Sequence, residues 1–184
     1  MEQTSPTTVT FSGEEYIQIG ETARPFWERG AVSDTPTFVM VVGGVAAGKT
    51  THRRAAYAEG YVHLDYGEIY LAFEKLLGKG HKNIPAFSLM AIDMVTYQAI
   101  QEKRNIVIEF IGDNAETMKE LIDTMKSYGY KVELIPIIAD VAESYKRHLK
   151  AVDDDPDYIS SHHSESFMLS ALKRHFENRA QGRL

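Results

Sequence analysis

Residues 38–50 read Phe-Val-Met-Val-Val-Gly-Gly-Val-Ala-Ala-Gly-Lys-Thr, and this stretch decides the fold. An apolar run typical of a buried parallel strand leads directly into the pattern G-x-x-x-x-G-K-[ST] over Gly43–Thr50. A helix-like stretch, 51–59, follows. An accidental Gly/Ala-rich turn is the alternative interpretation, but a position between a strand and a helix is the context that a phosphate-binding loop requires.

The residue types of this loop suit a phosphate chain, because successive backbone N–H groups converge on an anion only where side chains are small or absent. Lys49 is expected to reach the outer phosphates, and the Thr50 hydroxyl to take one position on an octahedral Mg²⁺. The positive end of the helix that begins near Gly48 points at the same anion. We therefore expect ATP or GTP, with Mg²⁺, to bind at Gly43, Gly44, Val45, Ala46, Ala47, Gly48, Lys49, Thr50 and Thr51.

The composition bounds the class of protein. The 184 residues, 43% of them hydrophobic, suffice for one well-buried domain and are too few for two. A net charge of −6 disfavours a nonspecific nucleic-acid binder, because such binding depends on a basic surface. The sequence has no cysteine, no leader pattern at its start and no apolar run of membrane-spanning length. We expect a soluble, cytoplasmic protein with no nucleic-acid or membrane partner.

Strand-like and helix-like segments alternate from Thr37 onward, which is typical of a parallel sheet covered on both faces. The expected strands are 37–42, 61–64, 105–110 and 131–138. The expected helices begin near Thr51, Gly67, Pro85, Ala115 and Asp140. The fold class is therefore α/β: a three-layer, nucleotide-kinase-like P-loop NTPase fold with a mostly parallel sheet of four or five strands and helices on both faces.

The chain is expected to form a single domain over residues 1–184. It divides into an N-terminal helical appendage, a core, a candidate lid and a C-terminal helix, at residues 1–36, 37–150, 151–164 and 165–184. The helix of the appendage is expected to start at a capping box, Ser12 to Glu15, and to be interrupted by Pro25.

Acidic residues stand where two of the expected strands end. Asp65 follows one strand with Glu68 one turn later, and Glu109 closes another. Ligands of open parallel sheets bind beyond these carboxyl ends, where Mg²⁺ or an acceptor hydroxyl would compensate a carboxylate. We expect Asp65 to bind metal and substrate, and Glu109 to bind substrate or metal. The structural alternatives are a helix cap for Asp65 and a buried ion pair for Glu109.

Arg147 is a candidate for catalysis, because a cation near the transferring group stabilises the charge of phosphoryl transfer. Glu143 lies four residues earlier, so a simple ion pair on a solvated helix face is an equally weighted alternative.

These pieces together resemble the zeta-toxin family of small P-loop kinases over residues 37–157. The resemblance lies in the first strand and its loop, the apolar strand ending in Glu109, the turn Tyr-Gly-Tyr-Lys-Val at 128–132, and Arg147. It implies an ATP- or GTP-using kinase that phosphorylates a hydroxyl of a small molecule, with UDP-N-acetylglucosamine as the substrate of studied relatives. It also implies an antitoxin-like protein partner.

The sequence departs from the family pattern after the second strand. The family ends this strand in Asp-x-Asp, whereas here Asp65 is followed by Tyr66 and Gly67, so the presumed base is missing. Either Asp65 or Glu68 could receive the acceptor proton. Two alternative functions therefore stand beside the kinase: a nucleotide-binding module without transfer activity that acts through a protein partner, and a nucleoside or nucleotide kinase unrelated to toxins.

Overall fold

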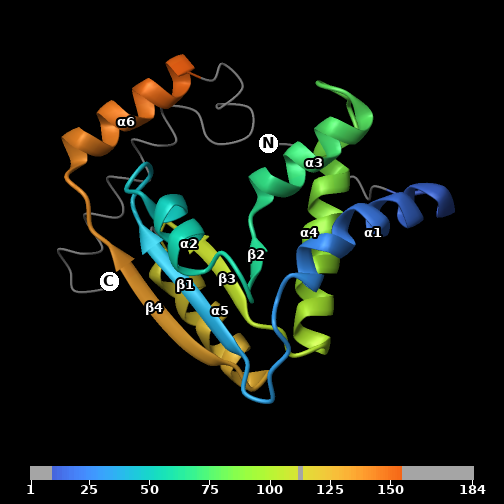
Figure 1. The fold of residues 1–184 in the computed structure, drawn as a ribbon, viewed down its shortest axis with the longest axis horizontal. Helices are drawn as coiled ribbons and strands as arrows, with labels where there is room; N and C mark the ends of the chain where they lie inside the picture. The colour runs from blue at the N-terminus through green and yellow to red at the C-terminus, as the bar shows by residue number, and fades with distance from the viewer. Residues whose placement is uncertain (1–9, 112–113, 155–184) are drawn as a thin grey trace, which may run out of the picture.

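The structure is a computed structural model and describes residues 10–111 and 114–154. Four strands and six helices are present in these residues (Figure 1). The strands are β1 Thr37–Gly43, β2 Val62–Leu64, β3 Ile106–Phe110 and β4 Lys131–Ile137, and the helices are α1 Gly13–Glu28, α2 Lys49–Ala56, α3 Tyr66–Leu77, α4 Ile84–Gln101, α5 Ala115–Ser127 and α6 Val141–Asp154. The expected alternation of strands and helices is confirmed.

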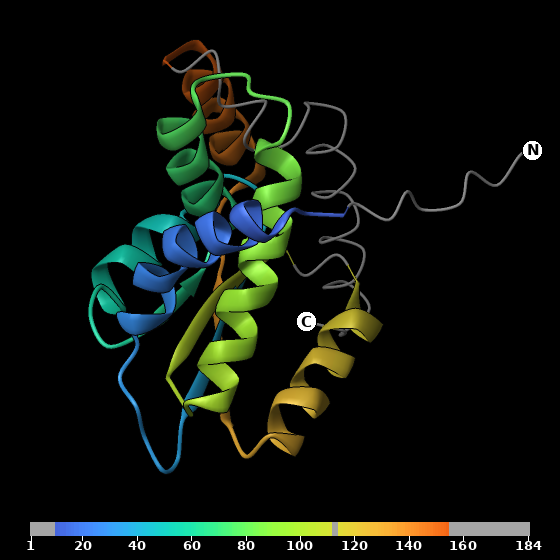
Figure 2. The ribbon, with the colours of Figure 1, turned by 90° about the vertical axis from the view of Figure 1, so that its right-hand side faces the viewer.

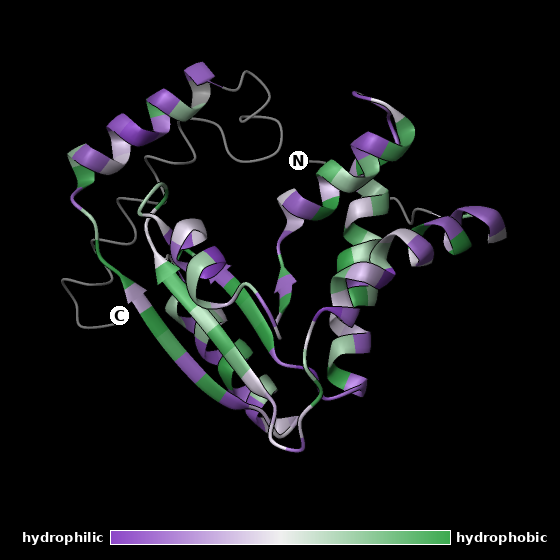
Figure 3. Ribbon diagram, viewed as in Figure 1, coloured by the Kyte–Doolittle hydropathy of each residue, from purple (hydrophilic) through white to green (hydrophobic). Residues whose placement is uncertain are grey.

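The strands form one parallel sheet in the order β2-β3-β1-β4. β1 lies between β3 and β4 and is apolar along its length (Figure 3). Because side chains of a strand alternate between faces, Phe38, Met40 and Val42 enter one core, whereas Val39 and Val41 enter another. A strand covered on both faces needs this continuous apolar sequence.

The two cores make three layers, as the fold class predicts. The larger core joins one face of the sheet to side chains of α1, α3, α4 and α5. The helix α2 lies on the opposite face, and α5 lies behind the sheet in Figure 1. In Figure 2, α1 crosses α4 on the outside of the molecule, in keeping with the many contacts between these helices.

The N-terminal helix differs from the expectation at its end. The capping box is confirmed: the Glu15 N–H donates to the Ser12 hydroxyl, and the Ser12 N–H donates to the Glu15 carboxylate. The prediction that Pro25 interrupts α1 is wrong, because the helix continues to Glu28. Pro25 sits in the last turn, where it removes one backbone hydrogen bond, and burial of Phe26 in the core offsets that loss.

The chain order places a ligand crevice beside β1. From β1 the chain crosses to β2 on one side, and from β3 it crosses to β4 on the other, so the switch point lies between the carboxyl ends of β1 and β3.

α6 runs through Asp154, so the first residues of the candidate lid are helical, and its remainder lies outside the described residues together with 165–184. No helix in the described part of the chain is long and apolar enough to cross a membrane.

Candidate active site

The phosphate loop occupies the turn between β1 and α2. Ala46 has a φ of 55° and Gly48 a φ of 102°, and both values lie in the left-handed region. Left-handed residues between right-handed ones turn neighbouring N–H groups toward a common point, which makes an anion-binding concavity. No side chain caps the start of α2, so its first N–H groups face the same point.

Lys49 is buried at the start of α2. Its side chain is folded onto the loop, where Nζ donates to the carbonyl oxygens of Gly43 at 3.0 Å and Gly44 at 2.8 Å. Burial lowers the pKa of Lys49, while the charge of Glu109 acts in the opposite direction. The buried ammonium group has neutral carbonyl oxygens as hydrogen-bond partners, and a phosphate would supply a negatively charged partner that binds it more strongly. The loop therefore fits a nucleoside triphosphate.

Thr50 and Glu109 form the second element of the site. The Thr50 hydroxyl donates to Glu109 Oε2 at 2.8 Å, which brings the loop helix and β3 together. In the described residues no group of three or more His, Cys, Asp or Glu side chains could hold a metal ion. A hydroxyl and one or two carboxylates, completed by phosphates and water, are nevertheless the donor set that Mg²⁺ uses in phosphoryl-transfer sites, so the residues fit this ion.

Arg53 connects the acidic residues of the site. Its side chain is 1% exposed, Nε donates to Glu109 Oε1 at 2.7 Å, and Nη2 donates to Asp65 Oδ2 and to Glu68 Oε1 at 3.1 Å. Nη1 contacts His63 Nδ1 at 2.6 Å. Strand ends that are distant in the sequence are thus joined through one guanidinium group.

Asp65 and Glu68 each have both oxygens occupied. Asp65 Oδ1 accepts the backbone N–H of Glu68 at 3.2 Å and caps α3, which is the structural role considered from the sequence, while Oδ2 binds Arg53. Glu68 binds Arg53 and, through Oε2, Arg29 at 3.3 Å. Burial opposes ionisation of Glu68, but the charges and hydrogen bond of Arg53 outweigh it and lower the pKa of Glu68.

His63 is a buried neutral link in this network. Nε2 donates to the Tyr57 carbonyl oxygen at 2.7 Å, so Nδ1 accepts from Arg53. Burial and the Arg53 charge lower the pKa of His63, against the hydrogen bond to Tyr57 and the nearby charge of Glu68. The structure therefore favours the uncharged imidazole.

Stability is expected to fall in mild acid because of His63. His63 of the unfolded chain takes up a proton near its ordinary pKa of 6.5, whereas folded His63 resists protonation, so the free energy of unfolding declines as the pH falls below 6.5. Urea unfolding between about pH 7.5 and 5 measures this, and His63→Gln, which keeps a donor and an acceptor but does not titrate, should show a shallower decline. Equal slopes for both proteins would contradict the assignment.

A cavity of about 1160 Å³ opens in front of the loop. Its lining includes Glu109 and much of the predicted loop, namely Val45, Ala46, Gly48, Lys49, Thr50 and Thr51. Gly43 and Gly44 lie behind Lys49, to which they offer their carbonyl groups, and the Ala47 side chain is buried. The cavity is large enough for two small substrates together, since sites for one commonly span about 300–1,000 Å³.

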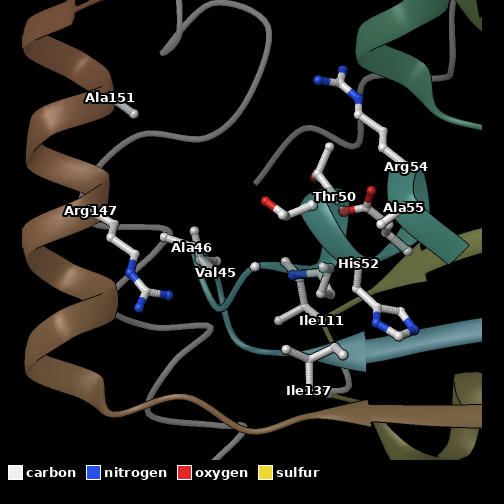
Figure 4. A pocket seen from close by; sticks show the side chains of 14 residues that line it. Val45, Ala46, Thr50, His52, Arg54, Ala55, Ile111, Ile137, Arg147 and Ala151 are labelled. Atoms are coloured by element: carbon white, nitrogen blue, oxygen red, sulfur yellow. Dashed lines mark hydrogen bonds between the residues drawn. The ribbon is translucent and has the colours of Figure 1, made fainter.

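Arg147 lines this cavity from α6. Figure 4 shows its guanidinium group pointing from the helix toward Val45 and Ala46 of the loop. Glu143, the alternative ion-pair partner, contacts Lys146 at 2.9 Å instead. Arg147 is therefore placed where it can approach a triphosphate, and its catalytic role stays a prediction.

Sequence reasoning did not assign a role to several residues of the site. No local pattern assigned a role to Arg53, or to Arg54 and Arg29, which both reach Glu68. One signal was available for Arg53: it follows Lys49 by four residues on α2, so the two side chains lie on the same face of the helix.

Comparison with known families identifies the family of this chain. The zeta toxin family matches residues 28–181, which include the loop, β3 with Glu109, and α6 with Arg147. The chain belongs to the zeta toxin family. It is thus a P-loop kinase by family, as the resemblance of its motifs implies. A search of curated proteins found no match.

Solved structures of other proteins support the fold. A chain from the PezAT chromosomal toxin-antitoxin system of Streptococcus pneumoniae is 19% identical, with a TM-score of 0.64 over 95% of this chain and 75% of that one. A chain of the AvrRxo1-ORF1:-ORF2 structure with ATP is 17% identical, with a TM-score of 0.66 over 91% of this chain. The present chain spans 57% of that protein. At these identities the likeness concerns the fold alone.

Proposed function

We propose that this protein transfers the terminal phosphoryl group of ATP or GTP to a hydroxyl group of a small molecule. The observation that carries the proposal is the convergence of the phosphate loop, Glu109 and Arg147 on one cavity. Phosphoryl transfer needs positioning and charge stabilisation more than covalent participation of the protein, and these groups offer both. Family membership and the ATP in the AvrRxo1-ORF1:-ORF2 structure support ATP as donor.

In this reaction a bond forms between the acceptor oxygen and the γ-phosphorus, and the bond from the γ-phosphorus to the β-phosphate oxygen breaks. The loop N–H groups and Lys49 hold the phosphates, and Arg147 stabilises the charge on the transferred group. Mg²⁺, when bound, neutralises phosphate charge, and Thr50, Glu109 and Asp65 are the residues proposed to hold it. The acceptor proton passes to a carboxylate at the β2 end of the site.

Asp65 is the better candidate for the base. Both oxygens of Glu68 bind guanidinium groups, and the lowered pKa makes Glu68 a weak proton acceptor. One oxygen of Asp65 has a neutral backbone N–H as its partner.

Asp65→Asn is expected to lower kcat by about 10²-fold or more, because asparagine keeps the helix cap but cannot accept the proton. Glu68→Gln is expected to have a smaller effect. Steady-state kinetics of both variants, with nucleotide affinity measured separately, make the comparison. A larger loss of kcat in Glu68→Gln would indicate that Glu68 is the base. Normal kcat in both variants would indicate that neither carboxylate acts as a base.

A sugar nucleotide such as UDP-N-acetylglucosamine is the acceptor that family membership favours. Arg54 suits such an anionic substrate, because its side chain is 65% exposed and lines the cavity on the side of α2 that faces α3.

An antitoxin-like protein partner belongs to the same proposal, supported by the PezAT toxin-antitoxin chain among the similar structures. A cytoplasmic location, where nucleotide and acceptor meet, completes it.

A nucleotide-binding module without transfer activity is the second candidate. It is favoured by Gly67, which stands where the family has its presumed base, and by the ion pairs that occupy Asp65 and Glu68. Incubation with Mg-ATP and pooled sugar nucleotides, nucleosides and amino-sugar alcohols separates the two, with mass spectrometry to detect added phosphate. A nucleoside or nucleotide kinase unrelated to toxins gains no support from the family match.

A further inference from the structure

Arg53 is buried beside the cavity without being part of its wall. Its side chain is 1% exposed, and the cavity lining includes its neighbours His52 and Arg54 and its partner Glu109 but not Arg53 itself. It lies four residues after Lys49, so both side chains extend from the face of α2 that is turned toward the protein interior. Arg53 can therefore influence a bound substrate through the groups that it holds.

Each carboxylate held by Arg53 uses its second oxygen for another contact. The second oxygen of Glu109 accepts the Thr50 hydroxyl, that of Asp65 accepts the first-turn N–H of α3, and that of Glu68 contacts Arg29. The guanidinium group thus fixes β3, the end of β2 and the start of α3 relative to the loop helix. A planar group with five N–H donors can span these positions, whereas a lysine ammonium cannot.

The charges give this contact a direct consequence for the site. Asp65, Glu68 and Glu109 are each 20–25% exposed and converge on Arg53, so its removal leaves three neighbouring carboxylates with less positive charge between them, although Arg29 and Arg54 still reach Glu68. Freed carboxylates would turn toward water, and Glu109 would leave Thr50. Glu109 gives one oxygen to the Thr50 hydroxyl, in the pair proposed for Mg²⁺, and the other to Arg53.

We propose that Arg53 is a positioning residue of this kinase site, which sets the Glu109 carboxylate beside Thr50 and so determines how well Mg²⁺ strengthens nucleotide binding. The inference rests on the proposed function for its choice of ligand. Residues that orient metal-binding groups commonly change metal affinity or activity by about 10–100-fold when they are replaced.

The test is the affinity for ATP, measured by calorimetry in EDTA and across a Mg²⁺ titration. Arg53→Met is expected to raise, by about 10-fold or more, the Mg²⁺ concentration that gives half of the gain in ATP affinity. The affinity for ATP in EDTA should change by less than about threefold. Arg53→Lys keeps the charge but not the planar set of donors, so it should shift the Mg²⁺ dependence in the same direction by a smaller factor, and it carries the test should Arg53→Met lose cooperative thermal unfolding. Lys119→Met, which removes an exposed charge on α5, serves as the matched control and should match the wild type.

A double-mutant cycle tests the route through Glu109. If Arg53 acts through this residue, Glu109→Gln combined with Arg53→Met should weaken the Mg²⁺ effect no more than the stronger single change. Unchanged Mg²⁺ dependence in the Arg53 variants, additive effects in the cycle, or an equal loss of affinity in EDTA would overturn the inference. A protein that binds Mg-ATP in this way but yields no product would fail the proposed function and leave the role of Arg53 standing.

Discussion

Lys49→Met is expected to reduce phosphoryl transfer by about 10³-fold or more, the largest loss among the single changes considered. The ammonium group is the cation proposed to bind the phosphates, and Lys49 is buried, so its charge contributes more to such binding than it would in solution. Product formation with saturating nucleotide and acceptor measures this loss.

The same change should leave the empty protein nearly as stable as the wild type. Lys49 is buried against two neutral carbonyl groups, so methionine removes a desolvated charge together with the hydrogen bonds that compensated it. Thermal unfolding without nucleotide should therefore shift by only a few degrees, whereas stabilisation by added ATP should be largely lost. Undiminished product in this variant would refute the assignment of the site.

Arg147→Met is expected to lower kcat by about 10²–10³-fold, while ATP affinity without acceptor changes much less. The guanidinium group approaches the loop from α6, where it can stabilise charge that develops only during transfer (Figure 4). Such an interaction lowers kcat in preference to ground-state binding.

Lys146 offers a matched control for Arg147. It is the preceding residue on the same helix, 72% exposed, and it pairs with Glu143. Lys146→Met removes an equal charge at the surface and should leave kcat unchanged, since exposed pairs of this kind contribute little. Equal losses in the two variants would indicate a general effect of α6 charge and would remove the catalytic role from Arg147.

The features predicted correctly from the sequence are those specified by local patterns. The strand-loop-helix around Gly43–Thr50, the capping box at Ser12 and the parallel strands each depend on residues close together in the chain. Pro25 shows where local rules fail, because burial of Phe26 carries α1 past a residue that would end an isolated helix.

The Arg53 network could not be predicted in the same way. Its partners Asp65 and Glu109 meet because β2 and β3 are neighbours in the sheet and α2 packs over their ends, which no local pattern specifies. For Arg147 the sequence left a choice between a ligand and Glu143, and the structure favours the ligand, since Glu143 contacts Lys146 and Arg147 lines the cavity.

Phosphoryl transfer at this cavity can be measured by following a labelled phosphoryl group from the nucleotide to an acceptor. The wild-type protein and Lys49→Met are incubated with Mg-ATP labelled in the γ-phosphoryl group and with the pooled acceptors, and products are separated and identified by mass spectrometry. A labelled phosphate ester is expected from the wild type and almost none from Lys49→Met. Binding of Mg-ATP by the wild type with no labelled ester from any acceptor would contradict the proposed function.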